Sequence, residues 1–325
     1  MLYPLKFKSI FKSKIWGGDK IKTLFGKNYS PLPNCGESWE LSGVQENISI
    51  VSNGFLKNNN LQELIDIYMD ELVGNKVFDK FGSEFPILIK FIDANDILSI
   101  QVHPDDELSK KRHKAFGKTE MWYIIDAINN AEIITGFKQK IDKNIYIKHL
   151  NDNTLKNILN IEKIKPDDVL FIPAGRIHSI GSGIFLAEIQ QTSDVTYRIY
   201  DWDRKDDSGN QREIHTDLAL DAIDFDIPDN YKTKYESKLN STSKIVECNY
   251  FNTNIIVFDK TIEKDYNFID SFVIYICIAG SFKINYDKNK YEKVKAGETI
   301  LIPAELKNIS LIPDNTSKLL EIYIK

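Results

Sequence analysis

One segment of this chain occurs twice in related form, and that repeat constrains the fold more than any other feature. Residues 164–180 (IKPDDVLFIPAGRIHSI) align without gaps with residues 294–310 (VKAGETILIPAELKNIS). Self-similarity of this kind indicates two structurally related units, which we expect to be two β-domains. His178 of the first copy stands opposite Asn308 of the second. Because imidazole is a common metal ligand, the first domain is the one predicted to carry chemistry.

Short β-rich runs dominate the chain, whereas helical patterns are rare. Many short strands with a few helical insertions are typical of a β-sandwich or barrel. The polar stretch of residues 226–243 has few strand formers and reads as a linker before a second β-rich region. The clearest strand candidates are residues 85–93, 97–103, 120–126, 168–174 and 185–191, and the helix candidates are residues 61–74, 142–160 and 213–224.

The overall charge and the apolar runs argue against several classes of partner. The 325 residues include 42 Lys and Arg against 47 Asp and Glu, and the net charge of −5 favours neither nucleic acid nor an anionic membrane. The N-terminus lacks the apolar core of a signal peptide, and no apolar run approaches the roughly 20 residues of a membrane helix. The three cysteines are scattered, which fits neither a disulfide framework nor a thiolate metal site. We therefore expect a cytoplasmic protein without nucleic-acid or membrane partners.

Polar and apolar side chains alternate strictly in the strand candidate around residue 100. Ser99, Gln101 and His103 share one face of that strand, and aliphatic residues occupy the other. A polar strand face usually turns to solvent. Here, however, Gln-x-His places an amide oxygen beside an imidazole, and Pro104 then ends the strand. The polar face is therefore a candidate half of a metal site.

Two further segments supply groups that bind metals. Glu120 begins the next strand candidate, and Pro173-Ala-Gly-Arg-Ile-His178 forms a tight turn that presents an imidazole at a strand end. A lone glutamate on a strand is nearly always a solvated surface charge. Together with Gln101 and His103, these residues offer two imidazoles, one carboxylate and one amide oxygen. That set suits a borderline divalent cation, with Zn²⁺ the leading choice and Mn²⁺, Co²⁺ or Fe²⁺ also admitted.

The order of these motifs resembles a known family. Pro-x-Gly-x-x-His matches the second metal motif of the cupin barrel, and the sequence resembles the type I mannose-6-phosphate isomerases of the short bacterial kind. The resemblance covers nearly the whole chain. The stretches that carry it are residues 16–18 (WGG), 36–40 (GESWE), 98–106 (LSIQVHPDD), 117–123 (GKTEMWY), 172–178 (IPAGRIH) and 196–202 (TYRIYDW).

This resemblance implies a fold and a metal site. The fold is expected to be mainly β, with two cupin-like jelly-roll β-barrel domains and helical insertions. We place a catalytic domain at residues 1–228, a linker at residues 229–243 and a second domain without metal ligands at residues 244–325. One Zn²⁺ per chain is expected, and the ligands implied by the resemblance are Gln101, His103, Glu120 and His178.

The family interconverts mannose 6-phosphate and fructose 6-phosphate by moving a proton between C1 and C2 through a cis-enediolate. By resemblance Arg198 is the catalytic arginine, and its permanent charge suits a developing oxyanion. The base is open among Glu188, Lys90, Glu37 and a metal-bound water. We favour Glu188, because a carboxylate beside a metal and an arginine stays ionised. Lys90 ends an apolar strand and is expected to have a depressed pKa.

The resemblance also implies a sugar phosphate as the partner molecule. Ser99 and Lys118 match positions that contact the phosphate, and lysine is a good point-charge partner for a phosphate dianion. The sequence has no glycine-rich nucleotide loop, so we expect neither ATP nor NAD. The protein is expected to be a monomer or a weak homodimer. Three histidines outside the motifs are expected to be surface or packing residues: His113, His149 and His215.

Two other functions compete with this interpretation. Another cupin enzyme, such as a metal-dependent oxygenase or a cupin-type glucose-6-phosphate isomerase, would usually present His-x-His and a single-barrel length. A non-catalytic sugar-binding protein would be expected to lose ligands, yet the first copy of the repeat keeps its full set. One residue departs from the cupin pattern: position 167 is Asp where Gly is common, although Gly297 fills the equivalent place in the second copy. The departure bears on the local turn and not on the metal site.

Overall fold

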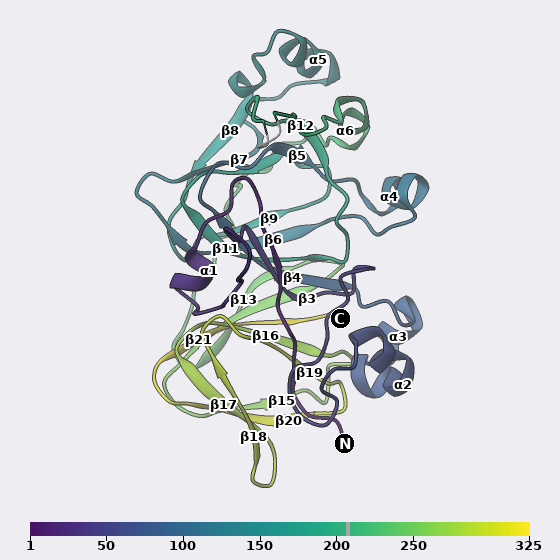
Figure 1. The fold of residues 1–325 in the computed structure, drawn as a ribbon, viewed down its shortest axis with the longest axis vertical. Coiled ribbons are helices and arrows are strands. Elements are labelled where there is room, and N and C mark those ends of the chain that lie inside the picture. The colour runs from purple at the N-terminus through teal and green to yellow at the C-terminus, as the bar shows by residue number, and fades with distance from the viewer. Residues whose placement is uncertain (206–208) are drawn as a thin grey trace. The chain divides into compact units, whose positions relative to one another are not determined.

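The structure is a computed structural model that describes residues 1–205 and 209–325. The described residues are mainly β and form antiparallel sheets (Figure 1), which confirms the predicted fold class. No helix in this part of the chain is long and apolar enough to cross a membrane. The chain divides into two compact units: unit 1 comprises Met1–Ile10, Trp39–Leu88 and Lys234–Lys325, and unit 2 comprises Phe11–Ser38 and Ile89–Thr233.

Each unit draws on separate stretches of the chain, whereas the predicted domains at residues 1–228 and 244–325 are sequential. Within unit 2, Tyr231 is buried and its hydroxyl donates to the Phe137 carbonyl at 2.7 Å. Strand β13 (Ser241–Glu247) begins inside the stretch that was expected to be a linker. The domain boundaries stay a prediction.

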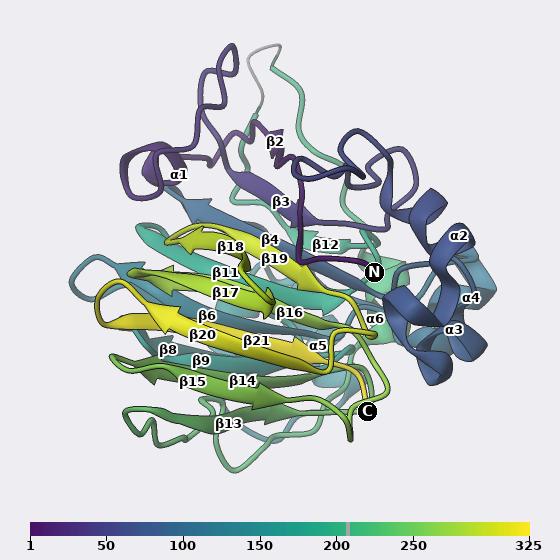
Figure 2. The same cartoon turned by 90° about the horizontal axis from the view of Figure 1, so that it is seen from below.

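Unit 2 contains a five-stranded antiparallel sheet and most of a six-stranded one, of which residues 10, 39–41 and 87–88 belong to unit 1. Every strand predicted from the sequence overlaps an observed one. The five-stranded sheet has the order β12-β5-β10-β7-β8, and the six-stranded sheet has the order β2-β3-β4-β11-β6-β9. Figure 2 shows β4, β11, β6 and β9 side by side. The strands are β2 (Ile10–Lys12), β3 (Glu37–Leu41), β4 (Ile87–Ala94), β5 (Ile100–Val102), β6 (Glu120–Ala127), β7 (Glu132–Phe137), β8 (Leu159–Lys163), β9 (Val169–Ile172), β10 (His178–Ile180), β11 (Ile184–Gln191) and β12 (Tyr197–Tyr200).

The five-stranded sheet is covered on both faces, and this decides where its polar residues point. One face shares a core cluster with the six-stranded sheet, for example Ile180 against Trp122. The other face packs Ile100 and Val102 in a second cluster with helices α5 (Lys143–Asn151) and α6 (Thr216–Ala222), which lie beside this sheet in Figure 1. Because those aliphatic residues face the helices, the alternating Gln101 faces the interior between the sheets. The remaining short elements of unit 2 are α1 (Lys20–Thr23), α4 (Asp106–His113) and the 3₁₀ turn η1 (Leu155–Asn157).

The helix predicted over residues 142–160 is wrong beyond residue 151. Helix α5 begins after Asp142, whose side chain accepts a hydrogen bond from the Ile145 amide at 2.9 Å. Asn153 then adopts a left-handed backbone with φ of 55°, a conformation that ends helices. The chain continues into η1 and β8. The helix predicted over residues 213–224 is confirmed as α6.

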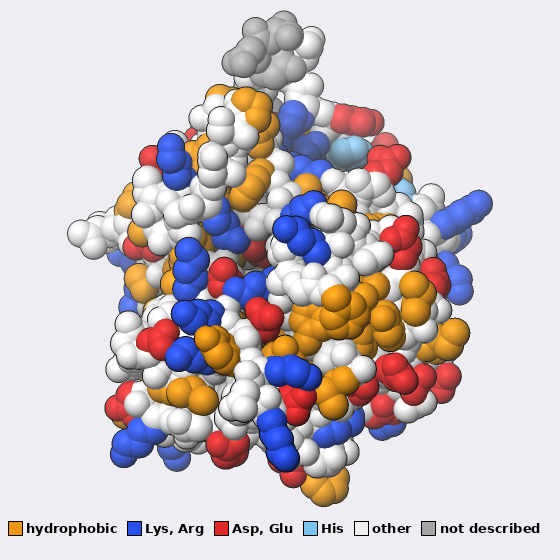
Figure 3. Space-filling model, turned by 60° about the horizontal axis from the view of Figure 1, so that its bottom comes forward, with side chains coloured by type: hydrophobic (Ala, Val, Ile, Leu, Met, Phe, Trp, Pro, Cys, Tyr) orange, Lys and Arg blue, Asp and Glu red, His pale blue; other side chains and the backbone are white. Residues whose placement is uncertain are grey.

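Unit 1 also contains two antiparallel sheets, with the orders β1-β19-β16-β21-β14-β13 and β15-β20-β17-β18. Side chains from both form one buried apolar cluster that includes Ile256, Phe282 and Leu319. On the face shown in Figure 3, positive and negative side chains are interspersed. The strands not yet introduced are β1 (Leu5–Lys6), β14 (Asn252–Phe258), β15 (Ile262–Asp265), β16 (Val273–Ala279), β17 (Ser281–Asp287), β18 (Lys290–Lys295), β19 (Thr299–Ile302), β20 (Asn308–Pro313) and β21 (Ser317–Tyr323).

Unit 1 also contains the helix predicted over residues 61–74. It is observed as α2 (Leu61–Val73) and is followed by α3 (Asn75–Phe81). Asn60 and Glu63 form a reciprocal capping box at the start of α2, in which the backbone amide of each residue donates to the side chain of the other. Leu61, Leu64 and Ile65 are buried on one face, so the helical period read from the sequence is confirmed.

The sequence repeat corresponds to the same local structure in both units. Residues 164–180 contain a turn, β9 and β10, and residues 294–310 contain a turn, β19 and the start of β20. Asp167 takes a left-handed φ of 71° where Gly297 has 83°. Aspartate tolerates this conformation better than most residues, and its carboxylate accepts a hydrogen bond from the Tyr123 hydroxyl. The departure at position 167 therefore leaves the turn intact.

Candidate metal centre

Strand register brings the predicted site residues together within unit 2. His178 on β10 and Arg198 on β12 each pair directly with Gln101 on β5, from opposite sides. Directly paired residues on antiparallel strands project from the same face. His178, Gln101 and Arg198 therefore form a row on the inward face of the five-stranded sheet. Glu120 comes from β6 of the six-stranded sheet.

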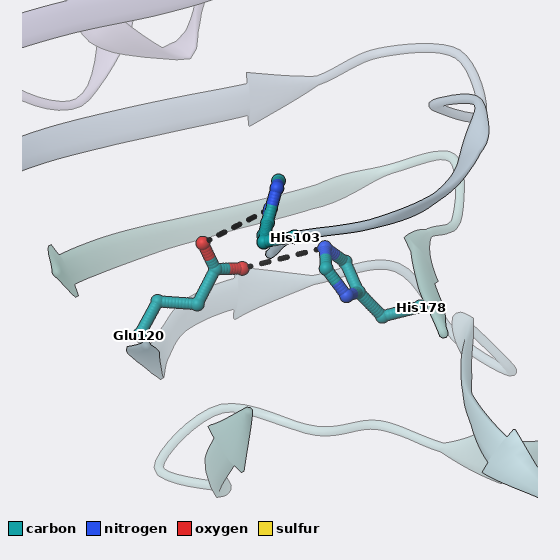
Figure 4. A group of neighbouring side chains, drawn as sticks. All are labelled: His103, Glu120 and His178. Atoms are coloured by element: carbon teal, nitrogen blue, oxygen red, sulfur yellow. Dashed lines mark ion pairs between the residues drawn. The ribbon is translucent and has the colours of Figure 1, made fainter. Parts of the chain in front are cut away.

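Three of the predicted ligands converge closely (Figure 4). His103 Nε2 lies 3.5 Å from Glu120 Oε2, and His178 Nε2 lies 3.5 Å from Glu120 Oε1. Their ligand atoms all fall within 4.8 Å of one another, and all three side chains are buried. Within the described residues, no other group of three or more His, Cys, Asp or Glu side chains has this spacing.

Backbone carbonyls fix the tautomers of both imidazoles. His103 Nδ1 lies 3.0 Å from the Val195 carbonyl, and His178 Nδ1 lies 2.8 Å from the Arg176 carbonyl. A carbonyl oxygen only accepts, so each Nδ1 carries the hydrogen and each Nε2 keeps a lone pair. Burial, reinforced by the Lys118 ammonium, lowers the pKa of His103 to about 3, and burial lowers the pKa of His178 as well. Both rings are therefore neutral near pH 7, which is the form that binds metals.

Glu120 adds a buried carboxylate to the two imidazoles. Burial by itself raises the pKa of Glu120, but the Lys118 ammonium and His103 outweigh burial and hold the pKa below its ordinary value. The ammonium of Lys118 lies 3.4 Å from Glu120 Oε2. Among the described residues, neither carboxylate oxygen of Glu120 has a hydrogen-bond partner, and His103 Nε2 has none either. Buried acceptors are rarely left in this state, and a divalent cation would satisfy all of them. The group could therefore hold a metal ion.

Gln101 and Ser99 border this group. The amide nitrogen of Gln101 lies 3.2 Å from His178 Nε2, and the Ser99 hydroxyl lies 3.4 Å from Gln101 Oε1. Ser99 and Lys118 are both buried. All six residues predicted for metal and phosphate binding are thus neighbours of Glu120 or of one another.

The candidate bases lie on the same six-stranded sheet as Glu120. Lys90 Nζ donates to Glu188 Oε1 at 3.1 Å, and the Trp122 indole donates to Glu188 Oε2 at 3.1 Å. Burial lowers the pKa of Lys90, but Glu188 and Glu37 outweigh burial and raise it, so the expected depressed pKa of Lys90 was wrong. Burial, reinforced by Glu120, raises the pKa of Glu188. Glu37 also pairs with Lys14, at 3.2 Å.

Arg198 is only partly buried and is held by the chain that follows it. Its Nη1 donates to the Glu213 carbonyl at 2.8 Å, and its backbone carbonyl accepts from the His215 amide at 2.7 Å. Burial, reinforced by Arg212, lowers the pKa of Arg198. The other two histidines outside the motifs also have local partners: His113 bonds the Tyr197 hydroxyl, and His149 bonds Thr154.

Some groups that shape the site were not predicted from the sequence. Trp122 could have been found, because it lies two residues after Glu120 and so shares its strand face. The carbonyls of Val195 and Arg176 carry no side-chain signal, since every residue has a carbonyl. Only the fold shows that these two carbonyls orient the imidazoles.

The chain has a cupin-type fold, and a candidate metal centre of two buried imidazoles and a carboxylate lies between two of its antiparallel sheets. The sequence model of the phosphomannose isomerase type I catalytic domain matches residues 4–140. The mannose-6-phosphate isomerase ManA of Bacillus subtilis is 38% identical over 76% of this chain and 77% of its own length. That of Streptococcus mutans is 39% identical over 71% of both chains.

Solved structures agree. The crystal structure of the mannose 6-phosphate isomerase from Bacillus subtilis is 33% identical, with a TM-score of 0.89 over 99% of this chain and 100% of the other. A phosphomannose isomerase mutant from Salmonella typhimurium is 16% identical with a TM-score of 0.78 over 99% of both chains, and this likeness shows the fold alone. The chain belongs to the type I phosphomannose isomerase family, and it is an isomerase.

Proposed function

We propose that this enzyme interconverts mannose 6-phosphate and fructose 6-phosphate at the site around Glu120. One observation carries the proposal: two neutral imidazoles and an ionised carboxylate converge in a buried space, and among the described residues neither His103 Nε2 nor either Glu120 oxygen has a hydrogen-bond partner. The named activity of relatives that match most of the chain supplies the substrate. The reaction is an aldose–ketose isomerisation, in which a proton moves between C1 and C2 through a cis-enediolate.

The residues present fit one divalent cation per chain, with Zn²⁺ the first choice. His103 and His178 would bind it through Nε2, Glu120 through its carboxylate, and Gln101 through its amide oxygen. The Gln101 amide already lies beside His178, and a half-turn of the amide exchanges its nitrogen for its oxygen. When bound, the cation supplies positive charge that stabilises negative charge developing on the sugar oxygens.

We assign the proton transfer to Glu188. Its two oxygens are oriented by Lys90 and Trp122. Its pKa is raised towards neutral pH, and a general acid–base group works best when its pKa lies near the working pH. Lys90 is a weaker candidate, because its raised pKa keeps the ammonium charged. Glu37 lies on the adjoining strand β3 and contributes to that raised pKa. Arg198, in the row beside Gln101, would stabilise the oxyanion of the enediolate.

Recognition of the phosphate is assigned to Ser99 and Lys118. Both are buried beside the metal ligands, where a lysine charge is weakly screened by solvent. We further propose a cytoplasmic enzyme that acts as a monomer or weak homodimer, without nucleic-acid or membrane partners. Its three cysteines are scattered along the sequence and fit no disulfide framework, as expected of a protein in a reducing compartment.

A coupled assay with mannose 6-phosphate, run before and after chelation, tests the function. We expect turnover to disappear when the metal is removed and to return when zinc is restored. Robust turnover that survives complete metal removal would overturn the metal mechanism. Absence of turnover with zinc restored would overturn the activity and favour the sugar-binding alternative.

A further inference from the structure

Two consecutive glutamines at the end of β11 connect the segments that carry metal ligands. Gln190 and Gln191 are both buried, and strand alternation places their side chains on opposite faces. Gln190 pairs directly with Glu120 of β6, so the Gln190 side chain lies on the same face as the candidate ligand. Neither glutamine belongs to the predicted metal or catalytic set.

The Gln190 amide folds the chain that follows β11. Its nitrogen donates to the carbonyls of Gln191, at 2.8 Å, and Ser193, at 2.6 Å. The Ser193 amide donates back to the Gln191 carbonyl at 2.8 Å, which closes a tight turn. Two residues later the Val195 carbonyl meets His103 Nδ1. The hydrogen bond that fixes the tautomer of His103 is therefore delivered by a turn that Gln190 holds.

Gln191 acts on the other ligand segment. Its side-chain oxygen accepts from the Thr119 amide at 2.9 Å, and its backbone amide donates to the Thr119 carbonyl at 3.1 Å. Its side-chain nitrogen donates to Asp106 Oδ1 at 2.9 Å, and the same oxygen accepts from the Gly117 amide at 2.8 Å. Residue 119 is thus held at both its N–H and its carbonyl, between Lys118 and Glu120.

We propose that Gln190 and Gln191 are positioning residues that hold His103 and Glu120 in ligand geometry. Gln190 acts through the Val195 carbonyl, and Gln191 acts through Thr119. The inference rests on the proposed function, because it concerns the same metal site. Groups that hydrogen-bond to metal ligands orient those ligands, and removing such a group typically weakens metal binding by about 10–100-fold.

The test compares zinc affinity with stability. Gln190→Leu and Gln191→Leu keep side-chain volume but remove the hydrogen bonds. Asn254→Leu is the matched control, because Asn254 is a buried amide in unit 1 that donates to Glu321. Zinc affinity is measured by competition with a chromophoric chelator, and Tm is measured on metal-free protein. We expect about 10–100-fold weaker zinc binding in each glutamine variant, and a lower Tm with unchanged affinity in the control.

A second variant keeps the test decisive if the leucine variants do not fold. Gln191→Glu keeps an oxygen that accepts from the Thr119 amide, but its second oxygen faces the Asp106 carboxylate. The repulsion between the two carboxylates should disturb this segment and weaken zinc binding. Adding Asp106→Asn removes one of the two facing negative charges, so part of the lost affinity should return. Wild-type affinity in all folded glutamine variants, with only a lower Tm, would overturn the positioning role. If wild-type protein binds zinc but does not turn over mannose 6-phosphate, only the proposed function fails, and absence of zinc binding by the wild type overturns both.

Discussion

Glu120 in unit 2 and Glu321 in unit 1 are both buried strand glutamates, yet their surroundings are opposite. Glu321 Oε1 accepts from the Tyr266 hydroxyl at 2.6 Å and pairs with Lys264 at 2.7 Å, and its Oε2 accepts from Asn254 at 2.8 Å. Glu120 faces His103 Nε2 and His178 Nε2, and neither of its oxygens has a hydrogen-bond partner among the described residues, although the Lys118 ammonium lies 3.4 Å from Oε2. A buried carboxylate whose oxygens are all hydrogen-bonded stabilises a fold, whereas one whose oxygens face two imidazole nitrogens can bind a metal ion together with them.

The repeat shows the same contrast at the position of the second histidine. His178 is buried beside Glu120, while Asn308, its counterpart, is exposed on β20. The two copies therefore share a strand–turn–strand structure but not an environment for a metal ligand. The following predictions test that contrast.

Exchanging the two repeat residues should have the largest effect. His178→Asn removes a ligand. Zinc affinity, measured by chelator competition, should therefore fall by more than the roughly 100-fold that is the largest usual loss when a residue that only orients a ligand is removed. The reverse change, Asn308→His, should add no second metal site, because position 308 is exposed. Unchanged zinc affinity in His178→Asn would refute the assignment of this ligand.

Removing the guanidinium beside Gln101 should affect the rate alone. We expect Arg198→Ala to reduce kcat by about 10²–10³-fold, the scale of losing one oxyanion partner, with the zinc content intact. Arg112→Ala is the control, since Arg112 pairs with Asp221 away from the site. An unchanged kcat in Arg198→Ala would exclude this arginine from the mechanism.

In unit 1 the corresponding change should affect stability and leave zinc binding alone. Glu321→Gln removes the negative charge that pairs with the half-buried Lys264 ammonium, and losing a hydrogen bond to a charged group costs about 1.5–3 kcal/mol. The free energy of unfolding, measured with urea, should fall by that amount, while zinc affinity stays at the wild-type value. A stable Glu321→Gln protein with weakened zinc binding would reverse the comparison.

The buried histidines should make metal-free protein sensitive to acid. The pKa of His103 is about 3 in the folded protein and about 6.5 in an unfolded chain, so the unfolded state takes up the proton first. Stability is therefore complete above about pH 6.5 and falls as the pH drops from there towards 3, by up to about 1.4 kcal/mol per pH unit for this residue. The free energy of unfolding of metal-free protein would be measured with urea at several pH values between about 3 and about 6.5. We expect it to depend less steeply on pH in His103→Asn than in the wild type. Equal slopes would contradict a neutral buried His103.

Local sequence patterns predicted the parts of the structure that depend on neighbours in the chain. Alternation around Gln101 and the turn before His178 located the candidate ligands, because both depend on a few successive residues. The pKa of Lys90 was wrong because it depends on Glu188, which lies 98 residues away in sequence. The carbonyl of Val195 was missed for the same reason: only long-range strand pairing brings it to His103.

Zinc binding per chain is the most direct test of the metal centre. Metal-free wild type, Glu120→Gln and Glu321→Gln would be titrated with zinc while bound metal is measured. We predict one zinc per chain in the wild type and in Glu321→Gln, and no binding at the same free zinc concentration in Glu120→Gln. A wild type that binds no zinc, or a Glu120→Gln protein that binds one zinc with wild-type affinity, would contradict the account.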